Sequence, residues 1–215
     1  MTDRLLLSAT ETAFLLHGED ADATERAARL LALPEPLRDP AVASTGLGSL
    51  VLRALAVPVT GGRVELAPSV TAVAAGLLRP RSWVEVALVS ANGAAPAVLF
   101  DAPPVRFLVA PRSYGCLEFA GVDTGAAVAD VLTELAVRHL ERFRPAIVSY
   151  RVGVPGTESC AVTVAAGADD AWTFAAGDDP DDAVHALERA DALERLTSAL
   201  TALLDPAVSR RSRSA

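Results

Sequence analysis

Hydrophobic residues in the first part of the chain recur at helical spacing, and polar residues that can start a helix precede them. Ser8 and Glu11, in the segment SATE, match a capping box in which the serine accepts from a backbone amide and the glutamate reaches back. Further helices are predicted over residues 22–33, over residues 44–56 and from Pro68 onward, since proline suits the first helical position. We therefore expect a helical N-terminal part over residues 1–80.

From residue 81 onward the hydrophobic period changes to two, which is the period of a half-buried β-strand. Val84, Val86 and Leu88 alternate with other side chains, and Asn92–Gly93 is a favoured turn pair, here expected in a loop longer than two residues. Short connections between successive strands imply an antiparallel meander. Its further strands are predicted over residues 96–101, 104–110 and 114–120. It carries side chains that either complete a core or form a surface: Trp83, Arg106, Leu108, Tyr114 and Glu118.

The remainder of the chain repeats the order of strands and helices. A long helix is predicted over residues 124–144, with Thr124 as its cap and a Glu134–Arg138 ion pair on its surface. Three strands (146–153, 159–166 and 171–177) and a last helix (181–204) follow. Strands in runs, rather than alternating with helices, indicate an α+β fold with antiparallel meander sheets and helices packed around them. We expect a single domain over residues 1–205 and a disordered tail over residues 206–215.

Composition and charge exclude several classes of protein. The chain has 215 residues, of which 51% are hydrophobic, and a net charge of −8. Acidic residues gather between residues 168 and 195, and there is no basic patch of the kind that nucleic-acid binding requires. No apolar run approaches the roughly 18–20 residues of a membrane span, and the start lacks the features of a signal peptide. We therefore expect a cytoplasmic protein. All basic residues are arginine, which together with the abundant alanine indicates a GC-rich, actinobacterial genome.

Residues that could carry chemistry are few and scattered. His17, His139 and His185 are not paired by their spacing, and Cys116 and Cys160 are expected as free, buried residues. The run GDDPDD at residues 177–182 contains carboxylates, which calcium prefers, but it lacks the spacing of an EF-hand loop. It fits better as a helix start, with Asp179 as the cap and Pro180 next. We predict no catalytic residue, no metal and no cofactor.

The segment from Val70 to Asp123 resembles the middle of the EspG family, the cytoplasmic chaperones of type VII secretion in actinobacteria. The resemblance lies in a helix that ends near Arg79–Pro80, a tryptophan-led strand, and a meander that leads into Val122–Asp123. AWTFAAGDDPDDAVHAL, at residues 171–187, is loosely similar to the C-terminal end of that family. The resemblance implies a chaperone without enzymatic activity, which shields a helical secretion substrate of the PE–PPE class. It also implies Asn92 and Gly93 as a contact with that partner.

Two other functions stay open from the residues alone. A small-molecule-binding or enzymatic α+β domain would place a pocket between sheet and helices, with polar groups converging on it. A winged-helix regulator would use the early helices and the turn and strand at residues 60–66, although residues 39–90 have a net charge of only +1. The oligomeric state is not fixed by the sequence.

Overall fold

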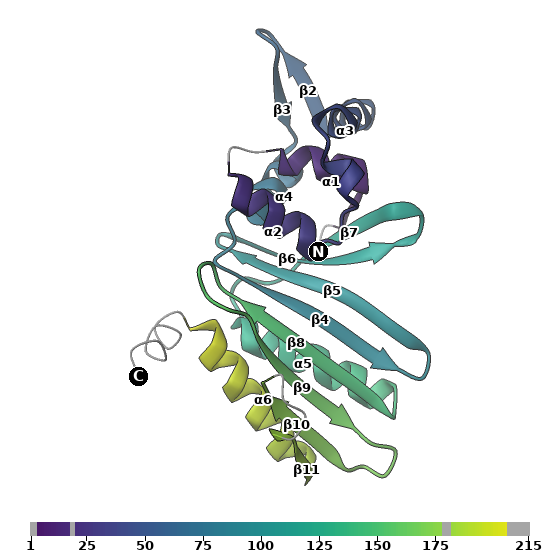
Figure 1. Ribbon diagram of the computed structural model, residues 1–215, viewed down its shortest axis with the longest axis vertical. Helices are drawn as coiled ribbons and strands as arrows, with labels where there is room; N and C mark the ends of the chain where they lie inside the picture. Colours follow the sequence, from purple (N-terminus) through teal and green to yellow (C-terminus); the bar gives the residue numbers. More distant parts are fainter. Residues whose placement is uncertain (1–3, 18–19, 178–181, 206–215) are drawn as a thin grey trace. The chain divides into compact units, whose positions relative to one another are not determined.

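A computed structural model describes residues 4–17, 20–177 and 182–205 of the chain (Figure 1). Its internal contacts divide the chain into two compact units. Unit 1 lies within residues 1–81 and 98–122, and unit 2 within residues 82–97 and 123–215. The chain passes between the units three times, so neither can be isolated by cutting the chain once. That residues 1–205 behave as a single domain stays a prediction.

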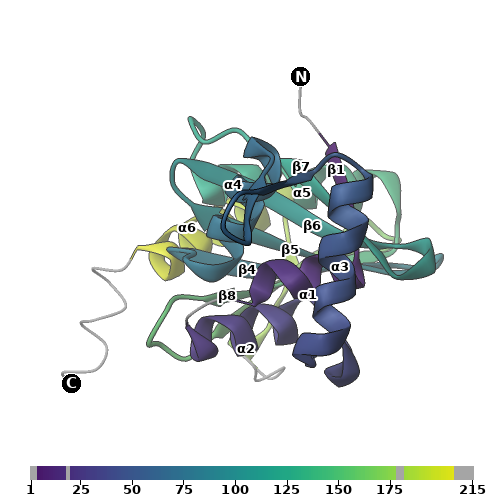
Figure 2. The same ribbon diagram turned by 90° about the horizontal axis from the view of Figure 1, so that it is seen from above.

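In its described residues, unit 1 combines four α-helices with antiparallel strands. Its strands follow the order β1-β7-β6-β5, and the helix α1 lies between α2 and α3 (Figure 2). Contacts of α1 with β7 and of α4 with β6 cover one face of this sheet. The elements are β1 (Arg4–Ser8), α1 (Ala9–Leu16), α2 (Ala21–Leu30), a 3-10 turn (Glu35–Arg38), α3 (Pro40–Leu52), β2 (Ala56–Val59), β3 (Arg63–Leu66), α4 (Pro68–Leu78), the end of β5 (Gly93–Ala102), β6 (Val105–Arg112), a 3-10 turn (Ser113–Gly115) and β7 (Cys116–Gly121).

Local sequence explains where these helices begin. The capping box is confirmed: Ser8 Oγ accepts from the Glu11 amide at 3.2 Å, and Glu11 Oε2 accepts from the Ser8 amide at 2.8 Å. Pro68 is the first residue of α4, as predicted. The third helix starts at Pro40, earlier than predicted, because Asp39 caps it by accepting from the Ala41 amide.

In the part of unit 2 that the structure describes, two α-helices lie on one face of a second antiparallel run of strands. The strands follow the order β5-β4-β8-β9-β10-β11, and α5 and α6 pack on β8, β9 and β10. Buried residues alternate along the strands, so that Val148, Tyr150 and Val152 of β8 face the helices. The elements are β4 (Ser82–Ser90), the start of β5, α5 (Val128–Arg142), β8 (Ala146–Gly153), β9 (Cys160–Ala166), β10 (Trp172–Ala176), β11 (Val184–Leu187) and α6 (Arg189–Leu204).

The α+β class and the antiparallel meander are confirmed: β5 pairs with β6, β6 pairs with β7, and β4 lies beside β5. The predicted strands over residues 146–153, 159–166 and 171–177 are confirmed as well. Two short edge strands, β1 and β11, were not predicted. Each is only four or five residues long, which leaves too few positions to establish a period of two.

Two predicted helix starts are wrong. Thr124 is not the cap of α5, which begins at Val128 after Ala127 and has no side-chain cap. The last helix begins at Arg189, because the preceding residues form β11 and pair with β10. The predicted last helix is therefore wrong over residues 184–187, which form a strand. Asp179 and Pro180, and the predicted tail over residues 206–215, lie outside the described residues.

Candidate protein-interaction surfaces

The turn that contains Asn92 is the first candidate surface, and it belongs to unit 2. The strand β4 ends at Ser90 and β5 begins at Gly93, so the loop is shorter than predicted. Gly93 has a φ of 116°, and a Cβ atom there would meet nothing within 4 Å, so its backbone faces open space. Asn92 is exposed, and its backbone N–H donates to Ser90 Oγ at 3.3 Å. Both residues are thus accessible, and their contact with a partner stays a prediction.

The second candidate is the face of the unit 2 sheet opposite α5 and α6, which we call the small-residue face. Register pairing aligns Ala87, Ser149, Thr163 and Ala175 in one row across four strands. Thr163 Oγ1 donates to Ser149 Oγ at 3.0 Å, so these hydroxyls already have a partner. Next to this row Ile147 is 43% exposed. The face comprises Glu85, Ala87, Val89, Ile147, Ser149, Arg151, Thr163, Ala165, Thr173 and Ala175.

The third candidate is the face of the unit 1 sheet opposite α1 and α4, which we call the arginine face. It comprises Arg4, Leu6, Ser8, Leu108, Ala110, Arg112, Cys116, Glu118 and Ala120. Two arginines converge on one carboxylate: Arg4 Nη1 lies 3.0 Å from Glu118 Oε1, and Arg112 Nε lies 2.5 Å from Glu118 Oε2. The hydrogen bond from Arg112, with the charges of both arginines, lowers the pKa of Glu118.

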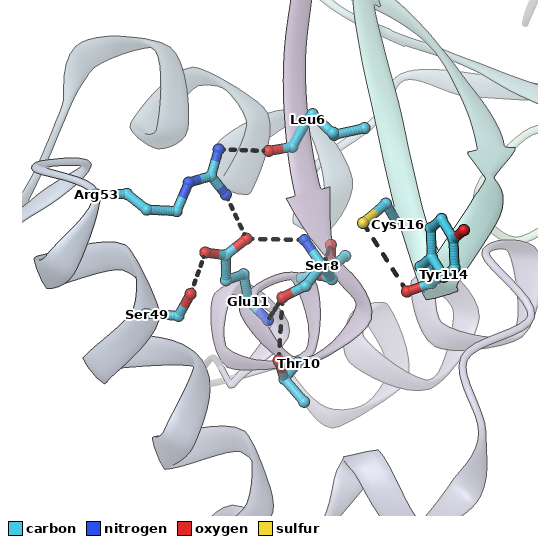
Figure 3. A network of polar contacts seen from close by, with 9 residues as sticks. Leu6, Ser8, Thr10, Glu11, Ser49, Arg53, Tyr114 and Cys116 are labelled. Atoms are coloured by element: carbon cyan, nitrogen blue, oxygen red, sulfur yellow. Dashed lines mark hydrogen bonds and ion pairs between the residues drawn. The ribbon is translucent and has the colours of Figure 1, made fainter.

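A buried polar cluster lies against the free edge of β1, which is the end of the strand order (Figure 3). The Glu11 carboxylate accepts from the Ser8 amide at 2.8 Å, from Ser49 Oγ at 2.7 Å and from Arg53 Nη1 at 2.7 Å. Arg53 Nη2 also donates to the Leu6 carbonyl at 2.8 Å. Burial alone would raise the pKa of Glu11, but the hydrogen bonds from Ser49, Ser8 and Arg53 outweigh it, and the pKa is lowered.

This cluster has a structural consequence for the edge of the sheet. An edge strand presents backbone groups that can pair with a strand of another chain. In β1 the amide of Ser8 binds the side chain of Glu11 in α1, and the carbonyl of Leu6 binds the side chain of Arg53, the residue that follows α3. The edge is therefore protected against strand addition, and the cluster does not resemble a catalytic site.

The remaining meander residues named from the sequence have different roles. Trp83 is buried, and its indole lies where a Cβ atom on Gly153 would be. Arg106 is buried, and its Nε donates to Asp101 Oδ1 at 2.8 Å. Leu108 and Glu118 lie on the arginine face, and Tyr114 is fully exposed in the turn between β6 and β7. The sequence named these residues but could not assign their environments.

The histidines are not brought together. His139 Nε2 lies 3.1 Å from the Val89 carbonyl, His185 Nδ1 lies 3.4 Å from Thr173 Oγ1, and His17 is exposed. Within residues 4–17, 20–177 and 182–205, no group of three histidine, cysteine or acidic residues could hold a metal ion. Both cysteines are free, but the expectation that they are buried is wrong, because Cys116 is half-buried and Cys160 is exposed at the start of β9.

A shallow groove of about 640 Å³ runs along α4 in unit 1. It lies between that helix and the turn from β5 to β6, and most of its lining side chains are small and apolar. Thr71 and Arg79 are the polar side chains in its wall. Two polar groups on one helix offer little of the convergence expected around a bound metabolite.

Fold and surfaces together define an α+β protein whose antiparallel strands have helix-covered faces and partly exposed opposite faces. Among solved structures, the chain is similar to one described as the Mycobacterium tuberculosis type VII secretion system chaperone EspG5 in complex with the PE25–PPE41 dimer. The TM-score is 0.55 and the identity 9%, with 94% of this chain and 96% of that chain covered. At this identity the similarity establishes the fold alone.

Comparison of the sequence with known families and proteins assigns the chain to no family. No protein-family model matches the chain, and no curated protein matches it. Within the described residues, no helix combines the length and hydrophobicity that crossing a membrane requires.

Proposed function

We propose that this protein is a chaperone-like binding protein of the cytoplasm, which shields a helical partner of the PE–PPE kind for type VII secretion. The observation that carries the proposal is the similarity of fold to EspG5 over almost the whole chain. The resemblance of residues 70–123 to the EspG family led to the same hypothesis, but no family model matches the chain, so the proposal rests on the fold.

The small-residue face is suited to this role. Alanine, serine and threonine side chains let the backbone of a partner helix approach closely, and Ile147 offers an apolar contact beside them. Covering an apolar helical tip in this way would keep the partner from associating with itself. The exposed Asn92–Gly93 turn belongs to the same unit and would add a second contact.

The test is co-expression with each PE–PPE-like pair encoded in the same genome. We expect one pair to become soluble only in the presence of this chain and to co-elute with it in size-exclusion chromatography. The substitution Ile147→Glu should abolish co-elution, since it places a charge on the small-residue face. Val184→Glu is the matched control, because Val184 is a similarly exposed apolar residue on the edge strand β11.

The turn is tested separately with Asn92→Arg, against Ala168→Arg in the exposed loop between β9 and β10. We expect only the first to weaken co-elution. The proposal is wrong if every pair has the same solubility with and without the chain, and also if none co-elutes with it.

A further inference from the structure

Tyr114 is the most exposed large hydrophobic residue in the described part of the chain, with a relative exposure of 102%. It lies in the turn between β6 and β7 with a φ of 63° and a ψ of 30°, which is the left-handed region. Non-glycine residues are disfavoured there, and the next residue, Gly115, also has a positive φ, of 66°. The chain therefore has a tyrosine where glycine would fit the backbone better, and folding does not bury its ring.

The arginine face begins beside this turn. Arg112 precedes the turn and Cys116 follows it, so Tyr114 extends from the end of that face. Leu6, opposite Glu118 in the register, is 46% exposed. Tyrosine and arginine are among the residue types that are enriched at the energetic centres of protein interfaces, and an exposed leucine adds apolar area. The composition is that of an interaction surface.

The charge of this face selects its partner. Arg4 and Arg112 share the single carboxylate of Glu118, so the group has a net charge of +1. Their side chains are 73% and 51% exposed, and a guanidinium has five N–H donors, more than Glu118 can accept. The whole protein has a net charge of −8, so this face would attract an acidic surface that the rest of the chain repels.

We propose that Tyr114, Leu6 and the Arg4–Arg112 pair form a docking surface for an acidic, amphipathic helix of a protein partner. The tyrosine ring and Leu6 would pack on the apolar residues of that helix, and the two arginines would bind its carboxylates. The inference rests on the proposed function only in taking the partner to be helical. It concerns unit 1, whereas the small-residue face and the Asn92–Gly93 turn belong to unit 2.

The experiment uses the full chain and a displayed library of 18-residue helical peptides in which surface positions vary. Clones are selected on the wild-type protein and then measured against variants. We expect enriched peptides to contain Asp or Glu beside an apolar stripe, and to bind Tyr114→Gly and Arg112→Glu at least tenfold more weakly. Arg63→Glu, at an exposed arginine on β3, is the matched charge control and should bind as wild type does.

Stability separates a binding role for the tyrosine from a structural one. Tyr114→Gly should preserve or raise Tm, by up to about 2–4 °C, because glycine suits the left-handed backbone. Ala54 is another exposed residue of unit 1 in the left-handed region, with a φ of 55°. Ala54→Gly should preserve or raise Tm as Tyr114→Gly does, and should leave peptide binding unchanged.

Three results would overturn the inference: no enrichment over a blank surface, enrichment of basic peptides, or equal binding of the selected peptides to wild type and Tyr114→Gly. The proposed function fails on a different result, the absence of any PE–PPE-like pair that depends on this chain. The two failures are therefore distinguishable.

Discussion

The two units build similar layers of helices on antiparallel strands but stabilise them by different means. Unit 1 pairs carboxylates with arginines at three positions: Glu11 with one arginine, and Asp101 and Glu118 with two each. Glu11 and Asp101 are buried. Unit 2 uses an apolar core in which the Tyr150 hydroxyl donates to the Leu132 carbonyl at 2.6 Å. Burial raises the pKa of Tyr150, so this hydroxyl stays protonated.

The difference extends to the outer faces of the two sheets. The face of unit 1 has a net charge and a fully exposed tyrosine at its end, which suits selection of a partner by charge. The face of unit 2 has small residues and paired hydroxyls, which suits close approach of a helix with little regard to its charge. Similar layers thus offer two different kinds of surface, and stability measurements can show whether the underlying networks differ as the contacts indicate.

The largest expected effect is that of Glu11→Ala. The Glu11 side chain is 1% exposed and binds Arg53, Ser49 and the Ser8 amide, so its loss leaves buried donors unpaired. Breaking a buried ion pair costs about 3–5 kcal/mol. Because Arg53 is 43% exposed and can turn to water, we expect the lower end, about 3 kcal/mol, in urea unfolding.

Glu118→Ala is the comparison, since that glutamate is also paired with arginine side chains, here Arg4 and Arg112. Its partners are more than half exposed, and exposed ion pairs contribute at most about 1 kcal/mol. If both variants lose the same free energy of unfolding, burial does not make the Glu11 ion pair stronger than the Glu118 pairs. The Glu11 cluster would then have no special structural role.

The next effect is smaller and tests the packing of α1 against α3. A Cβ atom on Gly46 would lie 2.2 Å from the Thr10 carbonyl oxygen and 2.9 Å from Glu11 Cα, so Gly46→Ala must separate the helices. We expect a loss of about 1–3 kcal/mol, as overpacked cores show. Gly48→Ala is the control in the same helix, because nothing lies within 4 Å of its Cβ position.

Alanine at Gly48 should raise the free energy of unfolding by about 0.5–1 kcal/mol, since glycine weakens a helix interior. The two substitutions are therefore expected to have opposite signs in the same assay. A loss of stability from both would mean that the spacing of α1 and α3 is not what Gly46 determines.

Most of the fold could be predicted from local patterns. The Ser8–Glu11 capping box, Pro68 at the start of α4, and the period-two strands on either side of the Asn92–Gly93 turn each depend on residues close together in sequence. One error arose where pairing with another strand decides the structure. Residues 184–187 form a strand because they pair with β10, and their own four positions are too few to show a period of two.

The candidate surfaces were less predictable than the fold. Tyr114, Leu108 and Glu118 were named from the meander, but which of them share a face depends on the register between β6 and β7. Arg4 and Leu6 were not named at all, because they matter only through pairing of β1 with β7, more than a hundred residues further along the chain. No local pattern in a single sequence indicates how β1 and β7 are aligned with each other.

The smallest effect is a difference between the units in their response to acid. The pKa values of Glu11 and Glu118 are lowered in the folded protein, so their contribution to stability is present above their unfolded pKa and is lost as pH falls through the folded value. Amide hydrogen exchange, corrected for its intrinsic pH dependence, should therefore accelerate in β1 and α1 between about pH 5 and about pH 3. Amides of β8, which depend on Tyr150 and apolar burial, should keep their protection over that range. If the amides of both units lose protection over the same pH range, residues 1–205 unfold as the single domain that the sequence predicts. In that case the ion pairs of unit 1 do not give that unit a separate free energy of opening.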